Sequence, residues 1–157
     1  HPMNSRKRRQ GMAKAGNTIQ ANERQVLKKY LTRYYRAKDK RSILQGRLRA
    51  IKRDLDRGGF MPPDSVQRIE AKIQQQTEAA ENSVLEIMGL LERLPPDSTE
   101  RTILELRHID CKTWEKIYQA AYLTRTPCFR YYNKGLDTLL GMSEVRQIIG
   151  LEEIAGG

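Results

Sequence analysis

Two regular series of mostly apolar residues constrain the fold of this chain most strongly. In both series, steps of three and four residues alternate without a break, which is the heptad pattern of a helix that packs along one side against another helix. The pattern therefore predicts two long helices. The first series comprises Leu27, Tyr30, Tyr34, Ala37, Arg41, Leu44, Leu48, Ile51 and Leu55, and the second comprises Val66, Ile69, Ile73, Gln76, Ala80, Ser83, Ile87, Leu90 and Leu94.

The segment between the two series predicts that these helices lie antiparallel. Gly58 and Gly59 end the first helix, and Pro62 and Pro63 follow in the turn. A connection this short makes consecutive helices antiparallel neighbours, so we expect a helical hairpin over residues 21–95. Two helices alone bury little apolar surface. We therefore expect the hairpin to self-associate, giving a homodimer, or to pack on the C-terminal part; the alternative is a spacer without a function of its own.

The charge of the chain is concentrated near its N-terminus. The 157 residues carry 29 Lys and Arg against 19 Asp and Glu, a net charge of +10. Residues 1–20 contribute +5 and residues 21–57 contribute +9, whereas residues 58–97 carry −4. Residues 1–20 contain few apolar side chains, which predicts a disordered basic arm. Such an arm followed by a basic helix favours a polyanionic partner, although a solvated terminus without a dedicated ligand has the same composition. The basic cluster of this arm is Arg6, Lys7, Arg8 and Arg9.

The C-terminal third predicts three short helices. Asp97 or Ser98 can cap a helix that ends near Ile109, and Thr113 can cap the next. A tight connection around 122–123 leads to a last helix that Thr124 can cap. Two short helices joined by a tight turn, the second with a polar and basic outer face, predict a helix-turn-helix domain over 97–141.

The outer face of the last helix carries the side chains that a base-reading helix needs. Arginine pairs with guanine, asparagine pairs with adenine, and an aromatic ring packs on the thymine methyl group. Lysines on the preceding helix are expected to lie against the phosphate backbone, and the start of the last helix can hold a phosphate. The predicted DNA-binding residues of this domain are Thr124, Arg125, Thr126, Phe129, Arg130, Asn133, Lys134, Lys112 and Lys116.

Residues 97–140 also resemble a known family. The matching features are the run R-x-I-L-x-L-R-x-I-D, then K-T-W-E-K-I, the T-R-T start of the last helix and the final G-L-D-T-L-L. This segment resembles region four of sigma-70-type factors, and more closely the sigma-like regulators encoded by phages of Gram-positive bacteria (the late-transcription activator and ArpU-like families). The resemblance implies activation of late genes, through contact with host RNA polymerase, and it places the family's base-reading positions on four residues of the set above: Arg125, Thr126, Phe129 and Arg130. The sequence departs from the family at Tyr122, where the turn usually holds glycine.

Other classes of protein find little support in the sequence. Besides His1, the chain has only His108, so no Ser/His/Asp or Cys/His arrangement is expected and an enzyme is not predicted. Cys111 and Cys128 lack the paired spacing of zinc ligands, and we expect neither a metal nor a cofactor. No apolar run approaches the roughly 18–20 residues of a membrane span, and the start of the chain lacks the apolar region of a signal peptide.

The sequence therefore predicts an all-α protein in four parts. These are a disordered basic arm (1–20), a coiled-coil-like antiparallel hairpin (21–95), a sigma region-four-like helix-turn-helix domain (97–141) and a C-terminal tail (142–157). The expected function is sequence-specific binding of double-stranded DNA as a phage or prophage transcription regulator in the cytoplasm of a bacterial host. The alternatives are a small terminase-type DNA-packaging subunit and a helical interaction protein that does not bind DNA.

Overall fold

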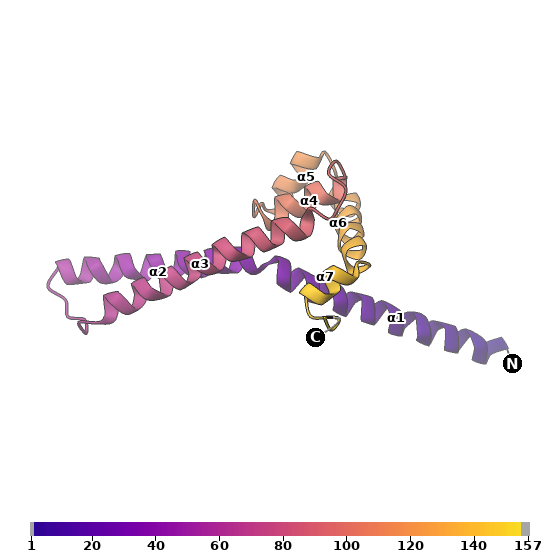
Figure 1. The fold of residues 1–157 in the computed structure, drawn as a ribbon, viewed down its shortest axis with the longest axis horizontal. Helices are drawn as coiled ribbons and strands as arrows, with labels where there is room; N and C mark the ends of the chain where they lie inside the picture. The colour runs from indigo at the N-terminus through magenta and orange to yellow at the C-terminus, as the bar shows by residue number, and fades with distance from the viewer. Residues whose placement is uncertain (1, 155–157) are drawn as a thin grey trace.

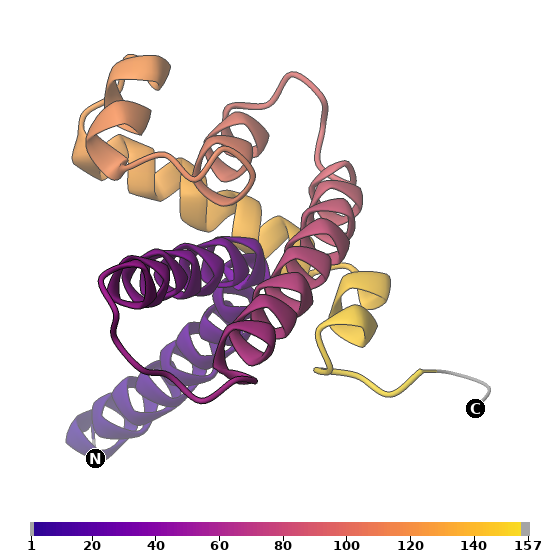
Figure 2. The same ribbon diagram turned by 90° about the vertical axis from the view of Figure 1, so that its left-hand side faces the viewer.

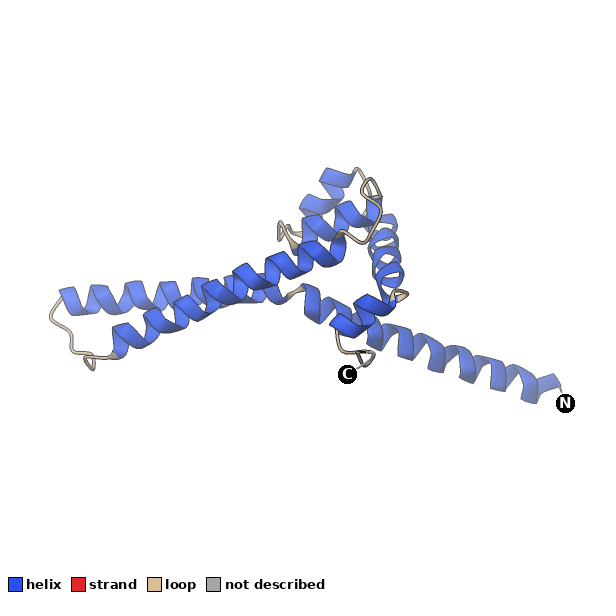
Figure 3. Ribbon diagram, viewed as in Figure 1, coloured by secondary structure: helices blue, strands red, loops and turns tan. Residues whose placement is uncertain are grey.

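The computed structural model describes the backbone of residues 2–154 and the side chains of residues 16 and 18–154. Every regular element in this range is a helix, so the all-α prediction is confirmed (Figure 3). The seven helices of this range are α1 (Pro2–Leu31), α2 (Arg33–Asp56), α3 (Ser65–Leu91), α4 (Thr99–His108), α5 (Trp114–Ala121), α6 (Arg125–Leu140) and α7 (Ser143–Ile148).

The N-terminal helix is much longer than the sequence predicts. The sequence predicts a disordered arm over residues 1–20, whereas the structure describes a helix that begins at Pro2. The segment is rich in Arg, Lys, Gln and Ala, which are strong helix formers. Pro2 occupies the first helical position, where its missing N–H costs nothing. The basic residues near the N-terminus are therefore part of a helix, although their side chains lie outside the described residues.

The predicted helix of 27–55 is interrupted at Thr32. Here α1 ends and α2 begins (Figure 1). The Thr32 hydroxyl donates a hydrogen bond of 2.6 Å to the carbonyl of Lys28, and Nε of Arg33 donates one of 3.0 Å to the carbonyl of Tyr30. Side chains that bond to backbone carbonyls in this way bend helices. The interruption lets α1 cross the C-terminal helices while α2 leaves in another direction.

Helices α2 and α3 lie side by side in opposite directions and project away from the rest of the chain (Figures 1 and 2). Heptad positions of α2 and of the facing part of α3 line the seam between the two helices. Ala37 of α2 and Ala80 and Ser83 of α3 are buried there, whereas Ile51 and Ile69 nearer the tip are only half-buried. Small residues therefore form the closest part of the seam, near the end at which the other helices gather.

The main core lies where α1 and α3 meet the C-terminal helices. Every helix except α2 contributes to it, so residues 97–141 do not have a core of their own. We call this set the central core; it comprises Leu27, Leu31, Ile87, Leu90, Leu91, Leu94, Ile103, Leu104, Ile117, Cys128, Tyr132, Leu136, Leu139, Leu140 and Val145. Val145 brings the C-terminal tail into this core through α7.

The caps of the C-terminal helices give a direct test of helix stability. The Thr113 hydroxyl accepts a hydrogen bond of 3.4 Å from the backbone N–H of Lys116, whereas Thr124 stands at the start of α6 without a side-chain cap. We expect Thr113→Ala to lower the free energy of unfolding by about 1 kcal/mol. Thr124→Ala is the matched control and should have a smaller effect. Equal losses in chemical denaturation would contradict this difference between the caps.

Candidate nucleic-acid interface

The candidate interface is built on α5, the turn after it, and α6. Thr113 is the N-cap residue of α5, and Tyr122 is its C-cap residue. The backbone of Tyr122 is in the left-handed region, with φ 56° and ψ 40°. The N–H of Leu123 then donates to the carbonyl of Tyr118 at 3.0 Å, closing the last turn of α5. Thr124 adopts an extended backbone and α6 begins at the next residue. The chain reverses within three residues, which holds the N-terminus of α6 close to the end of α5.

An aromatic cluster fixes α5 against α6. The ring centroid of Trp114 lies 4.5 Å from that of Phe129 and 5.1 Å from that of Tyr132, the second pair in an edge-to-face arrangement. Tyr118 completes the cluster, with its ring 6.4 Å from Phe129. Aromatic pairs in such geometries add about 0.5–1.5 kcal/mol beyond the area that they bury. The aromatic cluster therefore holds α5 and α6 together as one packed unit.

Gly135 permits the close approach of α4 to α6. A Cβ atom at this position would lie 2.5 Å from Cδ1 of Leu104 and 3.2 Å from Cβ of Glu100. Glu100 also approaches Lys134, with 3.8 Å between its carboxylate and Nζ. The three helices α4, α5 and α6 thus form one packed group that leaves the opposite face of α6 uncovered.

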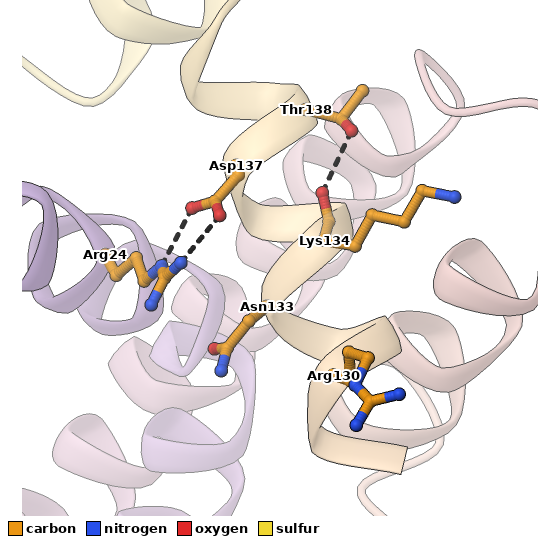
Figure 4. Close-up of a pocket in the computed structure, with 6 residues that line it drawn as sticks. All are labelled: Arg24, Arg130, Asn133, Lys134, Asp137 and Thr138. Carbon is orange, nitrogen blue, oxygen red and sulfur yellow. Dashed lines mark hydrogen bonds and ion pairs between the residues drawn. The ribbon is translucent and has the colours of Figure 1, made fainter. Parts of the chain in front are cut away.

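The uncovered face of α6 is polar and basic. Arg125, Thr126, Arg130 and Lys134 are exposed, and Asn133 is partly exposed. Asn133 projects toward α1, whereas Arg130 and Lys134 point away from it (Figure 4). From residue 116 to residue 136 the sequence contains no Asp or Glu. This face therefore presents cations and hydrogen-bond donors, and of its cations Lys134 is paired with Glu100 of α4.

Helix α1 borders the same face and forms a shallow groove with α6. Arg24 reaches across to Asp137, donating from Nε at 2.8 Å and from Nη2 at 2.6 Å (Figure 4). This paired hydrogen bond neutralises the carboxylate that lines the groove. The groove encloses about 590 Å³ and is lined by Arg24, Arg130, Asn133, Lys134, Asp137 and Thr138. One residue earlier, Glu23 pairs with Arg146 of α7, so α1 is held at two adjacent points.

A buried histidine joins α4 to α6 beneath this surface. Nε2 of His108 lies 2.8 Å from the hydroxyl of Tyr132. Burial, together with the charges of Arg107 and Lys28, lowers the pKa of His108 to about 3, against the opposing effect of a hydrogen bond with the backbone of Leu31. Burial also raises the pKa of Tyr132. Both groups are neutral at pH 7, and their hydrogen bond links α4 to α6.

The structure places six of the thirteen predicted DNA-binding residues at exposed or partly exposed positions at the start and along the outer side of α6. Phe129 is half-buried in the aromatic cluster and contributes to packing, although the guanidinium of Arg125 lies 5.9 Å from its ring centroid. Lys112 and Lys116 are exposed before and on α5. The predicted residues Arg6, Lys7, Arg8 and Arg9 have side chains outside the described residues.

Sequence reasoning missed two features of the site. Neither Arg24 nor Asp137 belongs to a motif, and no local pattern signals a pair separated by 113 residues. Tyr122 was predicted to lie in the turn, but whether that turn is left-handed depends on how α5 and α6 pack. The absence of acidic residues between 116 and 136 was the available signal for the extent of the basic face.

Two other kinds of site are not found. Among the described residues, no group of three or more His, Cys, Asp or Glu side chains is placed to hold a metal ion. In the described part of the chain, no helix combines the length and the apolar character that crossing a membrane requires. Comparison with protein families, curated proteins and solved structures gives no match for this chain.

Proposed function

We propose that this protein is a sequence-specific double-stranded-DNA-binding transcription regulator. The observation that carries the proposal is the uncovered basic face of α6, supported by the rigid packing of α5 and α6. In this interpretation α4–α6 form a helix-turn-helix domain, and α2 and α3 form a helical hairpin. The fold serves to present one helix whose exposed side chains can enter the major groove.

The side chains of α6 divide by position. Arg125 and Arg130 lie in its N-terminal half, where a helix in the major groove contacts base edges, and each can donate two hydrogen bonds to guanine O6 and N7. Asn133, one turn further along, suits adenine. Lys112 and Lys116 approach the phosphates, as does Thr124, whose side chain makes no capping hydrogen bond.

Helix α1 adds a second basic element. The Arg24–Asp137 pair fixes α1 beside α6, and its N-terminal half projects beyond the other helices (Figure 1). Because residues 1–20 carry five basic residues and no acidic residue, this half of the helix favours phosphate contacts. Such contacts make binding strongly dependent on salt concentration.

The wider biological proposal rests on the resemblance to sigma-like phage regulators. It comprises activation of phage or prophage late genes, contact with host RNA polymerase and action in the cytoplasm of a bacterial host cell, without an enzymatic activity. The hairpin would pair two copies, so that two α6 helices meet half-sites about 34 Å apart or a multiple of that distance.

A selection experiment tests the DNA-binding proposal. The protein is incubated with random duplex DNA at about 0.15 M salt, a concentration at which exposed charges are well screened, and the bound fraction is sequenced. We expect one enriched motif, and each of Arg125→Ala and Arg130→Ala should cost about 1–3 kcal/mol of binding free energy on that motif.

The matched control removes two equivalent charges elsewhere. Lys40 and Arg47 are exposed on α2, away from α6, so Lys40→Ala/Arg47→Ala should still select the same motif. If the wild type and Arg125→Ala/Arg130→Ala bind all sequences equally well, α6 does not read bases and the proposal fails. Light scattering of the same samples separates a dimer from the ring expected of a packaging subunit.

A further inference from the structure

Tyr122 combines two unfavourable features that stability does not explain. Its side chain is 94% exposed, and its backbone has φ 56°, in the left-handed region. That conformation costs a residue with a side chain about 1–2 kcal/mol relative to glycine. Among the described residues, Cys111 also has a left-handed backbone, with φ 54°, but it is partly buried, whereas Gly58 and Gly150 occupy such positions without this cost.

The turn explains why the backbone of Tyr122 is left-handed, but it does not explain why this position carries an aromatic ring. The N–H of Tyr122 donates to the carbonyl of Gln119 at 3.3 Å, and the next N–H closes the turn onto Tyr118. Leu123 is partly buried against the central core and anchors the turn. Glycine would make the same backbone hydrogen bonds without strain. Residues with a strained backbone of this kind cluster at functional sites. The strain lowers stability, so a residue that keeps it often has another use.

The position of Tyr122 indicates what its ring can contact. It lies three residues before Arg125, so its Cα is within about 11 Å of the start of the base-reading face of α6. The surrounding stretch from 116 to 136 carries basic residues and no acidic ones. A tyrosine there can place its ring against a deoxyribose and donate its hydroxyl hydrogen to a phosphate oxygen.

We propose that Tyr122 contacts the sugar-phosphate backbone of DNA beside the bases that α6 reads. The proposal rests on the DNA-binding function inferred above and adds a residue to that interface. It assigns the exposed ring a ligand and gives a reason for tyrosine at a position that glycine would occupy without strain.

The test compares Tyr122→Gly with the wild type in two measurements. We expect the variant to be more resistant to chemical denaturation, because the backbone strain is removed. Its affinity for duplex DNA should nevertheless fall about tenfold, the effect of one hydrogen bond to a charged group. Because tyrosine is neutral, the dependence of affinity on salt concentration should not change. Tyr122→Phe removes only the hydroxyl and should lose most of the same affinity, because the hydrogen bond accounts for it.

Phe60→Gly is the matched control, since Phe60 is 89% exposed in the loop between α2 and α3. It should leave DNA affinity unchanged. If Tyr122→Gly binds DNA as tightly as the wild type while Arg125→Ala/Arg130→Ala loses its motif, the inference about Tyr122 is overturned and the proposed function stands. If the wild type itself selects no DNA sequence, the proposed function and the inference fail together.

Discussion

Leu31→Ala is expected to lower the free energy of unfolding by about 2–5 kcal/mol. Leu31 is fully buried at the end of α1 and belongs to the central core. Truncation would remove apolar contacts and leave a cavity where α1, α4 and α6 meet. The loss is measured as a shift in the midpoint of denaturation at pH 7, and the basic face of α6 is left intact.

The control for this prediction is Ile43→Ala on α2. Ile43 lies in the part of α2 that only α3 covers, and its side chain is 47% exposed. Its truncation should cost much less, because the site borders solvent and no closed cavity forms. Similar losses for the two variants would show that Leu31 does not hold α1 against the C-terminal helices.

Leu31 also shows where the sequence pattern is insufficient for the fold. The heptad series includes Leu27, Tyr30 and Tyr34 and leaves out Leu31, because the pattern assumes one straight helix. In the structure α1 ends at Leu31, and Leu27 and Leu31 pack in the central core between α3 and the C-terminal helices. The break depends on side-chain bonds from Thr32 and Arg33 to the backbone and on packing against α4, which a local repeat does not encode.

For the second heptad series, the sequence predicts which residues face the neighbouring helix but not how deeply each of them is buried. Ala80 and Ser83 look like weak positions in the sequence, yet both are buried, because small side chains allow α2 and α3 to approach. The apolar residues near the tip pack less completely, since only one helix lies beside them. Burial along the pair therefore follows the position of the other helices more than the size of each side chain.

The candidate site was predictable where it depends on local sequence. The start of α5 follows from a capping threonine, and the exposed cations of α6 follow from helical spacing. Phe129 differs because an aromatic residue at a half-exposed position can face either DNA or Trp114, and only the packing of α5 selects between them. The bond between Arg24 and Asp137 joins distant parts of the chain, so it required the tertiary structure.

The stability of the fold is expected to fall as the pH decreases from about 6.5 toward 3. His108 is 6% exposed, and burial lowers its pKa in the folded chain to about 3 from an ordinary value of 6.5. Above pH 6.5 it is neutral in both states, and its contribution to stability is complete. Between the two values the unfolded chain binds a proton that the folded chain does not, so each pH unit removes about 1.4 kcal/mol.

This prediction separates His108 from the carboxylates, which titrate mainly below pH 5. Denaturation midpoints at pH 7, 6 and 5 should fall for the wild type by a total of roughly 2 kcal/mol in unfolding free energy over this range. His108→Gln keeps an amide that can bond the Tyr132 hydroxyl and has no titrating group, so its stability should change less over the same range. Parallel curves would mean that His108 takes up a proton in the folded state. Water would then reach the bond between His108 and Tyr132 more easily than the structure shows. The contact between α4 and α6 beneath the basic face of α6 would be correspondingly weaker.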